Sequence, residues 1–117
     1  MESSNQLGNR RALKDTTLGG VTLPAGTYVH IGIGAANRDP AQFADPDRLD
    51  IHREPNRHLA FGTGSHACAG MSLARMEAQV AIGRLLQRFA TIAPSGAFVR
   101  GGRARFRGFK SYPVRVS

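Results

Sequence analysis

The feature that most constrains this chain is the run FGTGSHACAG at positions 61–70. It contains the only cysteine of the chain, Cys68, together with Gly62, Gly64 and Gly70. Glycine permits backbone conformations with positive φ and a close approach of the backbone to a bulky group. A cysteine that only fills a core does not require three glycines around it. The pattern therefore favours a loop that presents a thiol.

The sequence after Cys68 has helical spacing, so the free N–H groups of a helix start are expected near the sulfur and favour the thiolate. A presented thiolate attacks a substrate, binds a metal or ligates a haem iron. A nucleophile needs a base oriented on its sulfur. His66 is only two residues from Cys68, so aiming its ring at that sulfur would need a strained local geometry. Zinc needs several ligands, and the four histidines show no familiar ligand spacing. A single thiolate suffices when a porphyrin supplies the other iron ligands, and the residues alone leave these uses open.

The segment 62–67, GTGSHA, also matches the dinucleotide-binding fingerprint with alanine at its third position. That fingerprint is followed about 20 residues later by an acid at the end of a strand. No acid follows Glu77 in this chain. The sequence therefore disfavours a dinucleotide site.

The composition predicts an incomplete globular unit. Of the 117 residues, 26 are Leu, Ile, Val or Phe, which is few for a self-sufficient core. The net charge is +8, and residues 78–117 contain eight basic residues and no acid. One cysteine excludes an internal disulfide framework, and no apolar run approaches a membrane span. The first ten residues lack the apolar core of a signal peptide, so we expect a cytoplasmic protein with no membrane partner.

The residue pattern predicts an α+β chain. The segment 1–9 is polar and without periodicity, and 18–34 reads as a β-hairpin that turns at Pro24-Ala25-Gly26. Asp39-Pro40 predicts a short helix within 36–53, and a coil is expected to continue to about His58.

One strong helix is expected over 71–89, because Ala74, Ala78, Ala81, Ile82, Leu85 and Phe89 fall on one face. A turn at 93–96 then leads to terminal strands at 103–109, where Arg alternates with smaller or apolar residues, and at 112–116.

The run FGTGSHACAG resembles the haem-binding loop of the cytochromes P450, the haem-thiolate monooxygenases. Their pattern is Phe-Gly-x-Gly-x-His/Arg-x-Cys-x-Gly, and all six specified positions are met. Segments on both sides resemble the bacterial form of the same family: LPAGTYV, ANRDPAQFADPDRLDIHR, LARMEAQ and RGFKSYPVRV. The resemblance implies that 10–117 is the C-terminal haem-binding segment of the mainly-α P450 fold, an incomplete domain preceded by a polar tail at 1–9.

The resemblance also assigns roles within the loop. It implies that Cys68 is the proximal ligand of haem b (iron protoporphyrin IX), where thiolate donation favours O–O cleavage. The other implied cofactor-binding residues are Phe61 beside the haem, Gly62, Gly64 and Gly70 in the tight loop, and His66 and Arg10 facing the haem propionates.

The implied partners are haem, a small organic substrate and an acidic electron donor such as a ferredoxin or flavodoxin-type protein, with no nucleic acid. The oxygen-activating helix and the Glu-x-x-Arg helix of the family are missing from this sequence. We therefore expect the chain alone to bind haem weakly, to lack monooxygenase activity and to expose its apolar faces. The alternative is a non-catalytic basic module that binds nucleic acid or an acidic protein through Arg100, Arg103, Arg105, Arg107, Lys110 and Arg115.

Overall fold

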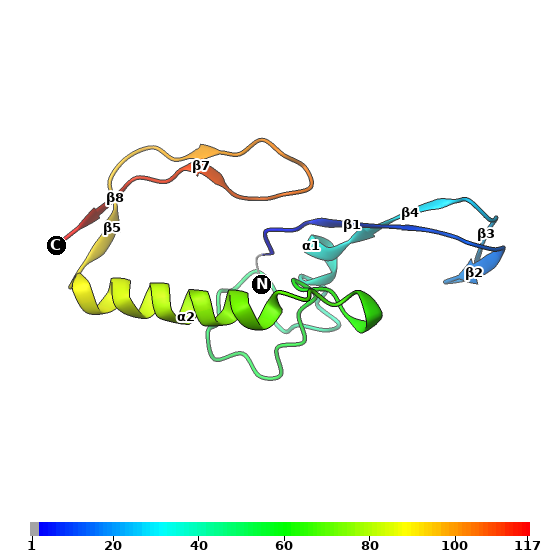
Figure 1. Cartoon of the computed structure of the whole chain (residues 1–117), viewed down its shortest axis with the longest axis horizontal. Helices are drawn as coiled ribbons and strands as arrows, with labels where there is room; N and C mark the ends of the chain where they lie inside the picture. The colour runs from blue at the N-terminus through cyan, green and yellow to red at the C-terminus, as the bar shows by residue number, and fades with distance from the viewer. Residues whose placement is uncertain (1–2) are drawn as a thin grey trace. The chain divides into compact units, whose positions relative to one another are not determined.

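The computed structural model describes residues 3–117, so Met1 and Glu2 of the expected tail lie outside the described residues. The chain divides into two compact units (Figure 1). One unit runs to Ala60 and includes Arg103–Arg107, and the other combines Phe61–Gly102 with Gly108–Ser117. Both helices and strands are present, as the α+β prediction required.

Two antiparallel strand pairs organise the first unit. Strand β1 (Leu7–Arg11) pairs with β4 (Tyr28–Gly32), so that Leu7 lies opposite Gly32 and Arg11 opposite Tyr28. Strand β2 (Thr16–Leu18) pairs with β3 (Val21–Leu23) across a two-residue turn. Residues 7–9 of the segment expected to be a polar tail therefore lie in a paired strand.

The expected hairpin at 18–34 is wrong in its pairing. A turn does form at its centre, where the Thr27 N–H donates to the Pro24 carbonyl at 3.1 Å. The strands on either side of that turn have different partners, because β3 folds back onto β2 and β4 pairs with β1. The cause is Gly19-Gly20, which adopts φ of 56° and 80° and so forms the tighter turn typical of hairpins.

The short helix expected after Asp39-Pro40 does not form. The Asp39 carboxylate accepts the Ala41 N–H at 2.9 Å, and its carbonyl accepts the Phe43 N–H at 2.8 Å. This capping turn is not continued, and Asp45 has a φ of 46°, which is incompatible with a right-handed helix. A helical turn precedes it instead, as α1 (Ile33–Ala36).

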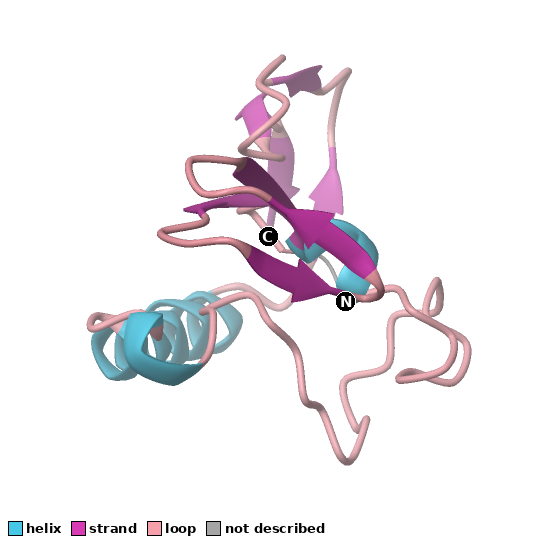
Figure 2. Cartoon of the chain, turned by 90° about the vertical axis from the view of Figure 1, so that its right-hand side faces the viewer, coloured by secondary structure: helices cyan, strands magenta, loops and turns pink. Residues whose placement is uncertain are grey.

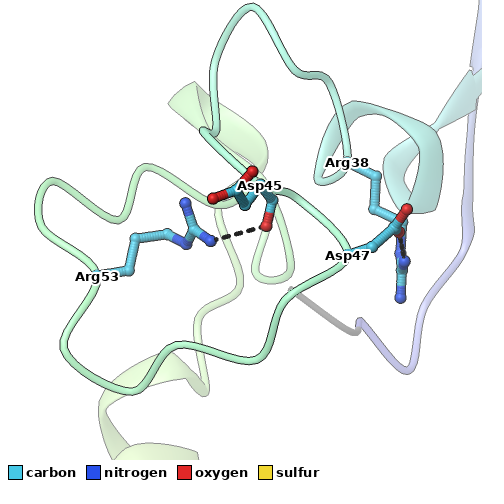
Figure 3. A network of polar contacts seen from close by, with 4 residues as sticks. All are labelled: Arg38, Asp45, Asp47 and Arg53. Carbon is cyan, nitrogen blue, oxygen red and sulfur yellow. Dashed lines mark hydrogen bonds and ion pairs between the residues drawn. The ribbon is translucent and has the colours of Figure 1, made fainter.

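Residues 38–58, here called the meander, contain no helix or strand and follow a long looped path between α1 and the next helices (Figure 2). Local straps hold this segment. Arg38 forms an ion pair with Asp47, and the Arg53 guanidinium donates to the Ala44 carbonyl at 2.6 Å and to the Asp45 carbonyl at 3.2 Å (Figure 3). Phe43 is only 3% exposed and gives the meander its buried apolar side chain.

The second unit begins with the short 3-10 helix η1 (Gly64–His66) and then α2 (Met71–Arg88), which confirms the helix expected at 71–89. None of the 18 residues of α2 is buried. Its exposed apolar side chains include Leu73, Val80, Ile82 and Leu86, the last 64% exposed. Within residues 3–117, neither α1 nor α2 combines the length and apolar character that a bilayer crossing needs.

Two short antiparallel pairs end the chain. Strand β5 (Ile92–Pro94) pairs with β8 (Val114–Val116), and β6 (Val99–Arg100) pairs with β7 (Phe109–Ser111). The turn expected at 93–96 therefore overlaps a strand.

The strand expected at 103–109 is mostly absent, because only Phe109 lies in β7 and Phe106 makes an isolated bridge to Asn5. That segment instead bonds to the start of the chain, where the Gln6 N–H donates to the Arg105 carbonyl and the Arg107 N–H to the Ser4 carbonyl, each at 2.8 Å.

The exposed apolar surface of α2 generates a prediction for the isolated chain. We expect it to enhance the fluorescence of the dye ANS and to unfold without a sharp transition, because α2 offers accessible apolar side chains and contributes no buried one. Leu86→Gln should lower the dye signal, whereas Arg84→Gln on the same helix should leave it unchanged. A cooperative thermal transition without dye binding would contradict this expectation.

Candidate functional site

The candidate site is the loop over residues 61–70, which lies in the second unit immediately before α2 (green in Figure 1). The Cys68 N–H donates to the Phe61 carbonyl at 2.8 Å and joins the two ends of the loop. Within it, the Ala67 N–H donates to the Gly64 carbonyl at 3.0 Å and closes η1. These two bonds fold the segment back on itself and fix the backbone of the cysteine.

The glycines of the loop have distinct roles. Gly62 and Gly64 adopt φ of 70° and 65°, a region that other residues enter only with strain. A Cβ on Gly62 would also lie 3.3 Å from the His66 carbonyl oxygen, whereas no atom of the described residues lies within 4 Å of a Cβ on Gly64. Gly70 has an ordinary φ of −87°, so its presence is not explained by a left-handed backbone.

The Cys68 thiol is exposed and lies beside the start of α2. Gly70 is the N-cap of that helix, and a Cβ built on it would lie 3.9 Å from the Cys68 Sγ. Among the described residues, no side chain caps this helix start, and its first turn contains no acid. The positive end of the helix is therefore left to a negatively charged group such as a thiolate.

Phe61 closes the loop through its carbonyl and joins the loop to α2 through its ring. The Arg75 guanidinium lies over that ring, with its carbon 5.7 Å from the ring centroid, a cation–π distance. The residue pattern predicted no contact between Arg75 and the loop. The signal was present, however, because residue 75 lies in the second turn of a helix that starts just after the loop.

The remaining predicted site residues are His66, which belongs to the loop itself, and Arg10, which belongs to the first unit. His66 ends η1 and is exposed. Arg10 lies on β1 in the first unit, where it is exposed, stands opposite Val29 and donates to the Asn9 carbonyl at 2.8 Å.

The residues of the loop fit a haem better than a metal held by side chains. Within residues 3–117, no three His, Cys, Asp or Glu side chains gather where they could hold a metal ion. An iron on Cys68 would thus take its other ligands from a prosthetic group, as it does from a porphyrin. The Cys68 thiol is exposed, and a Cβ built on Gly64 would meet no atom of the described residues within 4 Å.

Comparison with known proteins places the chain among relatives of one kind. A family model described as Cytochrome P450 matches residues 3–98. The chain is 52% identical over 91 residues to the biotin biosynthesis cytochrome P450 of Bacillus subtilis, a match that covers 78% of this chain and 23% of the relative. It is 57% identical over 83 residues to a mycinamicin IV hydroxylase/epoxidase of Micromonospora griseorubida, covering 71% of this chain and 21% of the relative.

A solved structure agrees with these matches. The crystal structure of P450BioI in complex with an acyl carrier protein ligated to hexadec-9Z-enoic acid superposes with a TM-score of 0.94 at 44% identity. That similarity covers 99% of this chain and 30% of the other. The chain spans about a quarter of the length of the curated relatives it matches. From the family match and these similarities, the chain belongs to the cytochrome P450 family.

Proposed function

We propose that this chain provides the haem-thiolate ligand loop of a cytochrome P450 monooxygenase, with Cys68 as the protein ligand of the iron. The observation that carries the proposal is the exposed Cys68 thiol, held on a closed glycine loop beside an uncapped helix start. Haem b, when bound, supplies the iron centre at which dioxygen is activated for hydroxylation of an organic substrate.

The chain's own residues hold that ligand in place. The Phe61 carbonyl fixes the Cys68 amide, and the Phe61 ring is covered by Arg75 on one of its faces. The Cys68 Sγ lies beside the Gly70 N-cap of α2, and no side chain of the described residues caps that helix start. We assign His66 and Arg10 to the haem propionates, because both side chains are exposed and both can donate hydrogen bonds to carboxylates.

The domain organisation is part of the proposal. Residues 10–117 form the C-terminal haem-binding segment, and other parts of a complete P450 domain cover the apolar side chains of α2. The lack of any buried residue in α2 and the quarter-length match to the relatives support this assignment. The names of the relatives include biotin biosynthesis and mycinamicin modification, so the proposal stops at a small organic substrate.

The basic-module alternative is less well supported. Three aromatic rings of this region contact one another rather than standing free to stack on bases, with the Phe109 and Tyr112 centroids 4.9 Å apart and Phe98 within 6.0 Å of both. Arg100 lies over two of these rings, and residues 105–107 are bonded to the start of the chain. The solved P450 relative also covers 99% of this chain, including the basic tail.

A chimera tests the ligand assignment. Residues 10–117 replace the matching segment of the Bacillus subtilis biotin biosynthesis P450, and the reduced carbon-monoxide spectrum is recorded. The chimera should show the red-shifted Soret band of thiolate ligation, and Cys68→Ala and Cys68→His should both lose it. Ser65→Ala, in the same loop, should retain it. A red-shifted band in either Cys68 variant would refute the assignment.

The glycine geometry predicts an order of effects on haem retention by the same chimera. Gly62→Ala should be the most harmful, because it combines positive φ with a 3.3 Å contact to backbone. Gly64→Ala should be intermediate, at about 1–2 kcal/mol for a left-handed alanine, and Gly70→Ala the mildest, since its φ is ordinary. Haem loss to apomyoglobin measures the order, and a Gly70 effect larger than that of Gly62 would contradict it.

The exposed Arg75 generates a prediction about electron delivery from an acidic ferredoxin or flavodoxin-type donor. Arg75→Glu should slow reduction of the chimera more at low salt than at high salt, because exposed charges are screened within about 10 Å at 0.1 M. Arg75→Gln separates loss of the Phe61 contact from reversal of charge, and Arg84→Glu is a charge-matched control further along α2. Stopped-flow reduction rates that depend neither on the charge at position 75 nor on the salt concentration would exclude a docking role for Arg75.

A further inference from the structure

We propose that Asn37 is a positioning residue for the Cys68 loop, acting through its side-chain carbonyl on the segment that leads into Phe61. The inference rests on the proposed function, because it assigns a task toward the same thiolate ligand.

Asn37 is the most deeply buried side chain that the structure describes, at 0% exposure. Its Oδ1 accepts the Leu59 N–H at 2.7 Å. Because a backbone amide only donates, this contact fixes which end of the carboxamide faces Leu59. Its Nδ2 has no hydrogen-bond partner within the described residues. A buried polar group that lacks a hydrogen bond lowers the free energy of unfolding. An apolar side chain at position 37 would avoid this cost.

The acceptor is anchored on the strand side of the first unit. Asn37 follows α1 directly as its C-cap residue, and its N–H donates to the Ile33 carbonyl at 3.0 Å. Ile33 is buried, and it follows directly on β4, which is paired with β1. The position of the Asn37 side chain is therefore set by α1 and the β1–β4 pair that precedes it, rather than by the meander.

The donor lies at the far end of the meander. Leu59 stands 22 residues after Asn37 and two residues before Phe61, whose carbonyl accepts the Cys68 N–H. The straps formed by Arg38 and Arg53 bind the meander to itself (Figure 3), whereas the Asn37–Leu59 bond joins the residue that follows the meander to the C-cap of α1. This bond thus restrains the chain just before the ligand loop begins, which the internal straps do not.

The test compares three variants of a chimera in which residues 3–117 replace the matching segment of the same Bacillus subtilis P450. Asn37→Leu keeps a similar volume but removes the acceptor, and Asn37→Asp keeps an acceptor oxygen. Asn9→Leu is the matched control, because the Asn9 side chain also bonds across a long stretch of chain, to His30 Nδ1 at 3.0 Å, but is exposed. Amide hydrogen exchange is read at Leu59 and Cys68, with the β1–β4 amides as an internal reference.

We expect Asn37→Leu to speed exchange at Leu59 about tenfold, the factor for a hydrogen bond of about 1.4 kcal/mol, and to speed exchange at Cys68 as well. Asn37→Asp should retain most of the Leu59 protection, and Asn9→Leu should leave both sites unchanged. If Asn37→Leu reduces protection equally at the β1–β4 amides, Asn37 only stabilises the first unit as a whole, and the proposal is overturned. An unprotected Leu59 amide in the unsubstituted chimera would also overturn it.

Haemin titration of the same chimeras supplies the second readout. Asn37→Leu should lower the fraction of bound haem with the red-shifted carbon-monoxide band, and Asn37→Asp should restore part of it. If the unsubstituted chimera binds haem without that band, the proposed function fails, whereas the exchange result still judges the Asn37–Leu59 bond. If the band and the protection both survive in Asn37→Leu, the positioning role is wrong.

Discussion

The hydrogen bond from the Cys68 amide to the Phe61 carbonyl determines how this chain presents its thiol. It requires the backbone to reverse within a few residues, which the positive φ angles of Gly62 and Gly64 make possible. The reversal places Cys68 directly before α2, with its Sγ close to the Gly70 N-cap. Along the chain, the meander leads into this closed loop and α2 follows directly after it.

The distribution of burial explains why local bonds matter so much in this molecule. The four buried residues among those described are Ser3, Ile33, Asn37 and Phe43, all within the first unit. In the second unit, the helix and the terminal strands expose their apolar side chains. Hydrophobic burial is the main favourable term in folding, and here it contributes little to the segment that contains the cysteine. The structure of the second unit is instead stabilised by the closure of the loop, the Phe61–Arg75 contact and the short strand pairs.

The sequence predicted the parts of this structure that depend on local signals. The spacing of apolar residues identified α2 to within one residue, and the glycines around Cys68 predicted the positive φ of Gly62 and Gly64, although not the ordinary φ of Gly70. Strand pairing was missed because it is non-local: nothing near Leu7 indicates that it pairs with Gly32, or that Gly19-Gly20 competes with Pro24-Gly26 for the hairpin turn. The Asn37–Leu59 bond was not predicted for the same reason, since its partners are 22 residues apart.

The central claim is that a sulfur atom of this chain binds haem iron, and X-ray absorption at the iron edge tests it most directly. The sample is the ferric chimera that contains residues 10–117, in which this segment supplies the ligand loop. One sulfur neighbour of the iron is expected in addition to the porphyrin nitrogens, and it should disappear when Cys68 is replaced by alanine. A first coordination shell of nitrogen and oxygen alone in the unsubstituted chimera would contradict the account.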